Sequence, residues 1–158
     1  MLNFSELQFE EIKTKAETEY NELGETYCSY FKEKIVFNSM CLEHLKFKSR
    51  ERARSQNDQY IRFKLLYLAP EIIRQSSTLQ GKWETKKFEK KRVNSRTDTV
   101  LTNVTYYEFI ALIKRDRVKV IVKQIENGPK FFWSLIPFWG MDMNTRSRIF
   151  HDGEPEID

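Results

Sequence analysis

The chain has 158 residues, of which 40% are hydrophobic and 14% aromatic, so it is long and apolar enough to bury the core of one domain and is not a disordered chain. Its formal net charge is +4, which suits a polyanionic partner such as RNA without requiring one. Two cysteines without a CxxC motif, and no apolar run of membrane-spanning or signal-peptide character, lead us to expect a reducing cytoplasm and no membrane.

The first predicted element is a helix from Ser5 to Leu23. Ser5 can cap its start together with Gln8, and Gly24 is placed to end it. The apolar stripe of this segment is modest, so we expect residues 1–25 to form an N-terminal helix on the outside of the domain.

A strand is predicted at Lys34–Asn38, followed by a short segment, Cys41–Leu45, that contains His44. A strongly basic run follows, interrupted only by Glu51. It is either a solvated loop or an edge that contacts phosphates. Its cations are Lys46, Lys48, Arg50, Arg52 and Arg54.

The next predicted helix runs from Asn57 to Gln75. Pro70 must either kink it or lie in the first turn of a second, short helix. A strand is predicted at Leu79–Glu89, and the polar segment Lys90–Thr102 is expected to be a mobile loop. This loop carries four cations that we also assign to RNA contacts: Lys90, Lys91, Arg92 and Arg96.

Three strands in succession are predicted between Val104 and Trp139. They are separated by Arg115-Asp116 and by Asn127-Gly128, the second of which is a strong hairpin signal. We expect a two-residue loop at each position and a last strand of sequence KFFWSLIPFW.

This register predicts that Glu108 faces Lys123, that Phe132 also faces Lys123, and that Val122 faces Trp133 on the opposite, wholly apolar side. The mixed face, with its carboxylate, lysines, serine and tyrosine, is where we expect chemistry. The assignment of the site depends on Lys123 and Trp133 lying on opposite sides of the sheet.

The order of elements predicts an α+β fold, an antiparallel β-meander sheet with N-terminal helices packed on one face. We divide the chain into an N-terminal helix (1–25), a main domain (26–142) and a C-terminal helical and acidic tail (143–158), with a short helix at Asn144–Phe150.

No P-loop, GxGxxG, HExxH or GxSxG motif is present. His44 is either an ordinary half-buried histidine or a general acid or base. A zinc site is a weaker alternative, and we expect no metal and no cofactor. The ligands of such a zinc site would be Cys28, Cys41, His44 and His151.

Glu108 and Lys123 have two interpretations. They form a cross-strand ion pair on a solvated face, or Lys123 binds a phosphate with help from Ser134. Aromatic residues of the same region either belong to the core or stack on bases. The stacking candidates are Tyr106, Trp83 and Phe132.

Five segments, KIVFN, CLEHLKFK, LAPEII, VKVIVK and FFWSLI, occur in an order that resembles the barnase–EndoU–colicin–RelE-like nuclease superfamily, in its small phage and mobile-element versions. The resemblance covers Lys34 to Trp139. It implies a metal-independent ribonuclease acting on tRNA or ribosome-bound mRNA, often as a toxin.

The family pattern matches a helix-start histidine at His44, a basic strand residue at Lys123 and a last-strand hydroxyl at Ser134. Arg62 and Tyr106 are candidates for an arginine and tyrosine pair. Cleavage without metal needs a base for the 2′-hydroxyl, an acid for the 5′-oxygen and cations for the phosphate. His44 can be the base or the acid, and Glu108 is an alternative base.

We therefore expect an endoribonuclease, a toxin or mobile-element effector, that acts in a bacterial cytoplasm or is delivered to a target cytoplasm. Its expected partners are RNA, either tRNA or mRNA, and an immunity or antitoxin protein. The alternative is a non-catalytic module of the same fold that binds RNA or a protein.

Overall fold

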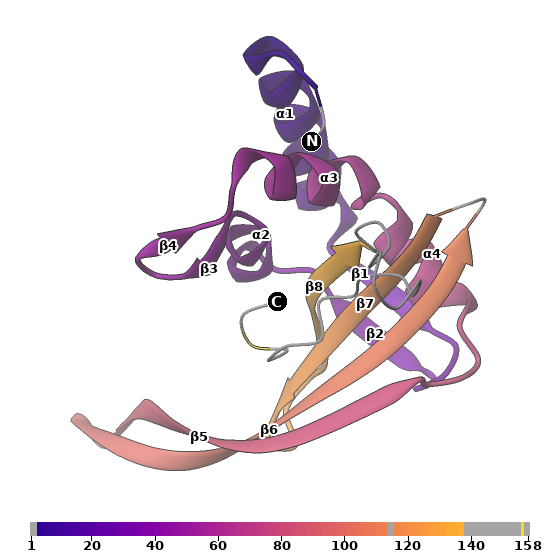
Figure 1. Cartoon of the computed structure of the whole chain (residues 1–158). Helices are drawn as coiled ribbons and strands as arrows, with labels where there is room; N and C mark the ends of the chain where they lie inside the picture. Colours follow the sequence, from indigo (N-terminus) through magenta and orange to yellow (C-terminus); the bar gives the residue numbers. More distant parts are fainter. Residues whose placement is uncertain (1–2, 114–115, 138–155, 157–158) are drawn as a thin grey trace, which may run out of the picture.

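The computed structural model describes residues 3–113, 116–137 and 156, and it has an α+β architecture with helices at the N-terminus and a mostly antiparallel six-stranded sheet (Figure 1). The predicted fold class is confirmed. The sheet has the strand order β1-β2-β8-β7-β6-β5, and β3 and β4 form a separate hairpin. The elements are α1 (Glu6–Leu23), β1 (Glu25–Cys28), β2 (Glu33–Val36), α2 (Ser39–Lys46), β3 (Phe47–Ser49), β4 (Arg52–Ala53), α3 (Gln56–Leu65), α4 (Leu68–Gln75), β5 (Gly81–Val93), β6 (Arg96–Ile113), β7 (Asp116–Ile125) and β8 (Phe131–Pro137).

Helix α1 starts and ends as its sequence predicts. The Ser5 hydroxyl accepts from the Gln8 amide, and the Gln8 side chain accepts from the Ser5 amide at 2.9 Å, which completes a capping box. Gly24 ends the helix at a φ of 66°, a conformation that glycine adopts without strain. The helix is nevertheless not peripheral, because Phe9 and Tyr20 are buried in the core.

The predicted strand at Lys34–Asn38 is β2. No separate strand was predicted at β1, which pairs with β2 in antiparallel orientation at the edge of the sheet. On its other side β2 is parallel to β8, through the pairing of Val36 with Phe131. Asn38 caps the helix that follows, because its side chain accepts from the Cys41 amide. His44 therefore lies in the last turn of α2, so the helix-start position that the resemblance implied for it is wrong.

The single long helix predicted at Asn57–Gln75 is two helices, α3 and α4. Pro70 lies in the first turn of α4, where its missing amide hydrogen costs nothing. This is the second of the two outcomes expected for Pro70. The break lets α4 bury Ile72 and Ile73, while α3 directs Arg62 to a different part of the core.

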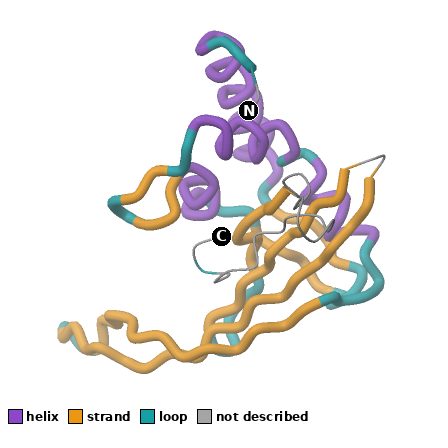
Figure 2. Tube along the Cα trace, viewed as in Figure 1, coloured by secondary structure: helices purple, strands orange, loops and turns teal. Residues whose placement is uncertain are grey.

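The mobile loop predicted at Lys90–Thr102 is wrong, because this segment belongs to a long hairpin. Strands β5 and β6 pair without interruption to Val93 and Arg96. Asn94 and Ser95 connect them at φ values of 48° and 65°, as two-residue hairpin turns require. Figure 2 shows this two-stranded ribbon, here called the β5–β6 hairpin, extending beyond the other strands.

The register between β6 and β7 differs from the predicted one by two residues. Ile113 pairs with Asp116, and Glu108 pairs with Ile121 rather than with Lys123. A shift of two preserves the faces of both strands. Tyr106 is therefore the partner of Lys123.

The register between β7 and β8 contains an irregularity that the sequence did not reveal. Ser134 pairs with Ile121 as predicted, but Phe132 pairs with Val122, which makes Trp133 the extra residue of a β-bulge. Phe132 consequently moves to the core face and stacks on Phe37, with 4.9 Å between the ring centroids.

The core lies between the helices and the central strands β7 and β8. It includes the apolar residues of β7, such as Val120 and Val122, which are fully buried. None of the helices within the described residues is long and apolar enough to cross a membrane. The predicted helix at Asn144–Phe150 lies outside the described residues.

Candidate active site

The bulge in β8 turns Trp133 toward the side of the sheet that carries Lys123. The Lys123 ammonium lies 4.0 Å from the centroid of the Trp133 ring, and the ring of His44 from α2 stacks on the same indole at 4.2 Å and 23°. The prediction that Lys123 and Trp133 lie on opposite faces is therefore wrong. The register that supported the site does not exist, and the bulge brings His44 and Lys123 to one indole instead.

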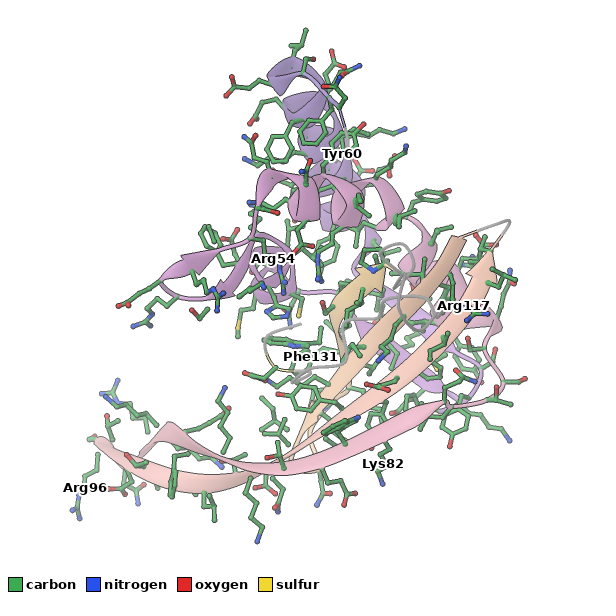
Figure 3. The ribbon with its side chains drawn as sticks, viewed as in Figure 1. Arg54, Tyr60, Lys82, Arg96, Arg117 and Phe131 are labelled. Carbon is green, nitrogen blue, oxygen red and sulfur yellow. The ribbon has the colours of Figure 1, made fainter. Side chains whose placement is uncertain are left out.

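His44 has a second neighbour that sets its protonation state. Arg54 donates from Nε to the His44 carbonyl at 3.0 Å, and its Nη2 lies 3.4 Å from Nε2 of the imidazole. A guanidinium has donors only, so this contact requires an unprotonated Nε2 and a neutral ring. Arg54, expected among the surface RNA contacts, is in fact buried at 3% exposure. Figure 3 places its side chain among the helices.

Arg62 is held deeper in the same cluster. Its Nε donates to Asp58 at 2.5 Å, and its Nη1 donates to the Ser134 hydroxyl at 3.1 Å and to the Leu135 carbonyl at 2.8 Å. Asp58 also pairs with Arg54 at 3.5 Å. Arg62 and Ser134 are brought together as the resemblance implied, but both are buried and engaged with protein groups. Their arrangement fixes α3 on β8.

The electrostatics of the cluster follow from burial among cations. Burial, and then the charges of Arg54, Arg62 and Lys123, lower the pKa of His44 to about 2. Burial and the nearby Lys87 lower the pKa of Lys123 to about 8. At neutral pH the imidazole is neutral, and Lys123 is a cation that can release its proton more readily than an ordinary lysine.

Glu108 does not reach this cluster through the predicted pairing. Its carboxylate pairs instead with Lys119, 3.3 Å away. Both residues lie closer than Tyr106 and Lys123 do to the last strand pair, Ile113 with Asp116. The predicted Glu108–Lys123 ion pair is wrong. Tyr106 does lie beside Lys123, whose ammonium is 5.5 Å from the tyrosine ring.

Of the residues predicted to stack on bases, Phe132 is excluded because it is fully buried in the core. Tyr106 is also buried, at 2% exposure. Trp83, which pairs with Tyr106 across β5 and β6, is 53% exposed. Only Trp83 of these three offers a ring face to solvent.

A cleft of about 780 Å³ opens above His44 and Trp133, between α2 with the β3–β4 hairpin on one side and β5 on the other. It is the place where a ligand can reach the cluster. The residues that line it are Met40, Glu43, His44, Phe47, Lys48, Ser49, Arg50, Lys87, Trp133 and Glu156.

The predicted RNA-contact residues other than the buried Arg54 divide into three groups. Lys48 and Arg50 line the cleft, and Arg52 is exposed on β4. Lys46 is engaged, since it pairs with Glu17 at 2.7 Å and with Glu43 at 3.0 Å. The third group is exposed on the β5–β6 hairpin, where Figure 3 shows Arg96 at the tip. It consists of Lys90, Lys91, Arg92 and Arg96.

The zinc alternative finds no support in residues 3–113, 116–137 and 156. No group of three or more His, Cys, Asp or Glu side chains in these ranges is placed to hold a metal ion. Cys28 and Cys41 are both buried as free thiols, and His151 lies outside the described residues.

No protein-family model matches the chain, and no curated protein and no solved structure matches it significantly. The proposed function therefore depends on the arrangement of side chains around His44.

Four residues of the site were missed from the sequence. Trp133 was assigned to the core, because an unbroken register was assumed across the bulge. Asp58 had a signal, since it precedes Arg62 by one helical turn and follows Arg54 by the same spacing. Lys87 and Glu156 had none, because their approach to Lys123 depends on how distant segments fold together.

Proposed function

We propose that this protein is a metal-independent endoribonuclease that cleaves RNA through attack of a 2′-hydroxyl on the adjacent phosphate. The observation that carries the proposal is the neutral imidazole of His44, held beside the cations Arg54 and Lys123 at the floor of an open cleft. A neutral imidazole has the electron pair that a general base needs, and Arg54 donates to this pair when no RNA is bound.

In the proposed reaction, Arg54 donates to the entering phosphate instead of to Nε2 of His44. Nε2 then accepts the proton of the 2′-hydroxyl, and the 2′-oxygen forms a bond to phosphorus. The bond from phosphorus to the 5′-oxygen breaks, and the leaving oxygen takes a proton from Lys123. The products are a 2′,3′-cyclic phosphate and a 5′-hydroxyl. Lys123 suits the role of acid because its pKa of about 8 is near neutral pH.

The low pKa of His44 is a property of the protein without RNA. Three cations lower it together with burial, and a phosphate that enters among them brings a compensating negative charge. An opposite charge within about 4–6 Å favours the protonated form. RNA itself therefore raises the basicity of His44 at the moment when it is needed.

The deciding experiment incubates the purified protein with total tRNA in EDTA and maps the cut ends. We expect cleavage in wild type and a rate about 10²–10⁴-fold lower in His44→Gln, because the base is lost. His151→Gln makes the same change at the other histidine of the sequence and should cleave at the wild-type rate. Melting curves establish that each variant is folded, which matters because His44 is buried.

A non-catalytic RNA-binding module is the second candidate, favoured by one observation. Arg62 and Ser134, two of the expected catalytic groups, are enclosed and hydrogen-bonded to each other, so neither approaches a substrate without rearrangement. A module would bind tRNA and leave it intact in wild type. Full cleavage by a folded His44→Gln protein would remove His44 from the mechanism.

The proposal extends to a biological setting that rests on the resemblance alone. We propose that the protein is a toxin or mobile-element effector, active in a bacterial cytoplasm or delivered to a target cytoplasm, with tRNA or mRNA as substrate. An immunity or antitoxin protein is its proposed partner. The exposed cations of the β5–β6 hairpin make such a partner acidic on its contacting face.

A further inference from the structure

The carboxylate of Glu156 lies in the cleft between two lysines from different strands. Its Oε1 accepts from the Lys87 ammonium of β5 at 2.5 Å, and its Oε2 accepts from the Lys123 ammonium of β7 at 2.9 Å. The same cleft is lined by His44 and Trp133. One anionic group with two acceptor oxygens thus bridges two cations beside the neutral imidazole.

The position is built to hold an anion. The Lys123 side chain is 5% exposed, so its charge is largely removed from water, and the face of the Trp133 ring covers it at 4.0 Å. Lys87, in contrast, is partly solvated, because its side chain is 45% exposed and extends into the cleft from its wall. A buried ammonium of this kind needs a negative partner to offset its desolvation.

A second observation at the same place points to a ligand. The Tyr106 hydroxyl is buried and has no hydrogen-bond partner among the described residues. Tyr106 pairs with Lys123 across β6 and β7 and shares its face. A buried hydroxyl without a hydrogen-bond partner is destabilising. A ligand with more acceptor oxygens than one carboxylate could satisfy it.

A phosphodiester has the same essential features as the Glu156 carboxylate, one negative charge and two non-bridging oxygens. It is bulkier and presents its ester oxygens as further acceptors. We propose that Lys87 and Lys123 form a phosphodiester subsite for an RNA strand, and that Glu156 occupies this subsite when no RNA is bound. The RNA assignment rests on the proposed function.

Glu156 then competes with RNA for the phosphodiester subsite within the same molecule. An RNA strand must displace it, so the apparent affinity is reduced by the fraction of molecules in which the subsite is free. If that fraction is about one tenth, removing the competing charge tightens RNA binding about tenfold. A long strand can still displace Glu156, because it also contacts the cations of the cleft and hairpin.

The test compares wild type with Glu156→Gln, which preserves shape and removes the charge. Binding is measured by fluorescence anisotropy with a 2′-O-methyl RNA oligonucleotide, which cannot undergo 2′-hydroxyl attack. Salt is held constant, because RNA affinity depends steeply on it. We expect Glu156→Gln to bind about tenfold more tightly.

The matched control is Glu25→Gln. Glu25 also pairs with a lysine, Lys34 at 2.9 Å, but it lies on β1 at the opposite edge of the sheet from β5. The Glu25→Gln variant changes the net charge by the same amount as Glu156→Gln, and it should leave the affinity for RNA nearly unchanged. In a Lys87→Gln background the gain from Glu156→Gln should shrink, since one half of the subsite is missing.

The outcomes separate this inference from the enzyme proposal. Equal affinities for Glu156→Gln and Glu25→Gln overturn the inference, even if wild type cleaves tRNA. Tighter binding by Glu156→Gln, lost in the Lys87→Gln background, supports the subsite even if no variant cleaves unmodified RNA. Absence of RNA binding in all variants overturns both proposals.

Discussion

The cluster around His44 and the β5–β6 hairpin both carry arginines and lysines, yet the two regions use them in opposite ways. In the cluster, Arg54 and Arg62 are 3% and 1% exposed and are bound by Asp58 and by backbone carbonyls. On the hairpin, Arg92 and Arg96 are exposed to solvent. Buried charges fix geometry and shift the pKa values of their neighbours, whereas exposed charges mainly attract a polyanion over a distance.

The physical reason for the difference is solvation. A buried guanidinium is stable only if its donors are satisfied, so Arg62 holds three groups in place at once. A solvated guanidinium keeps its water and can exchange it for phosphate at little cost. Composition alone does not distinguish a buried guanidinium from a solvated one. The comparison is therefore tested most directly by making the same substitution at a buried and at an exposed cation.

The largest effect is expected at Arg62. Arg62→Leu removes the charge and the hydrogen bonds that Arg62 donates to Asp58 and Ser134, so we expect the free energy of unfolding to fall by about 3–5 kcal/mol. Urea denaturation measures it. Arg96→Leu makes the same change on the hairpin and should alter stability by no more than about 0.5 kcal/mol. A comparable loss in both variants would contradict the distinction.

A smaller effect concerns the pH dependence of stability. The pKa of His44 is about 2 in the folded protein and 6.5 as its ordinary value. Between these values the unfolded chain binds a proton that the folded protein does not, so stability falls as pH falls below 6.5. We expect the free energy of unfolding to fall by about 1.4 kcal/mol per pH unit over the first units below pH 6.5.

The measurement is urea denaturation at pH of about 7.5 and about 5.5, in wild type and His44→Gln. The variant lacks the titrating group and should lose less stability over this range, with the difference equal to the contribution of His44. Lys90→Gln on the hairpin should follow wild type. An identical pH dependence in wild type and His44→Gln would mean that His44 titrates normally.

The smallest effect on the fold is expected on the hairpin. Replacing Lys90, Arg92 and Arg96 together by glutamine should leave the melting temperature unchanged, because all three are exposed. If RNA runs along the hairpin, its affinity should fall and the slope of log affinity against log salt should decrease by about 2, at roughly 0.7 per lost contact with a single strand. The control replaces three exposed helical cations, Lys15, Lys64 and Arg74. Equal slopes in both triple variants would exclude the hairpin from RNA binding.

Much of the local structure was determined by short-range signals in the sequence. Ser5, Gln8 and Gly24 define α1 through groups within a few residues of each other, and such signals operate before the chain is folded. The three final strands follow from alternation of apolar and polar residues. Asn94-Ser95 was overlooked because its flanking strands are exposed on both faces, so the alternation that reveals a half-buried strand is absent.

The candidate site was predicted only in part. His44, Lys123, Arg62 and Ser134 do lie in one region, but the reason given for it was wrong. Alternation of apolar and polar residues predicts a regular pairing of β7 with β8, whereas the bulge at Trp133 brings the indole into contact with both His44 and Lys123. Glu108 was included because the predicted register between β6 and β7 was wrong by two residues, and it is paired with Lys119 instead.

The sequence by itself thus determined the α+β class, the capped first helix and the alternation that buries one face of β7, since each depends on residues close together in the chain. Tertiary structure alone decided the bulge, the burial of Arg54 and the approach of Glu156 to Lys87 and Lys123. These features depend on the packing of segments far apart in sequence. Packing also determines how much water each charge keeps, and therefore whether an arginine organises a site or remains free to bind a phosphate.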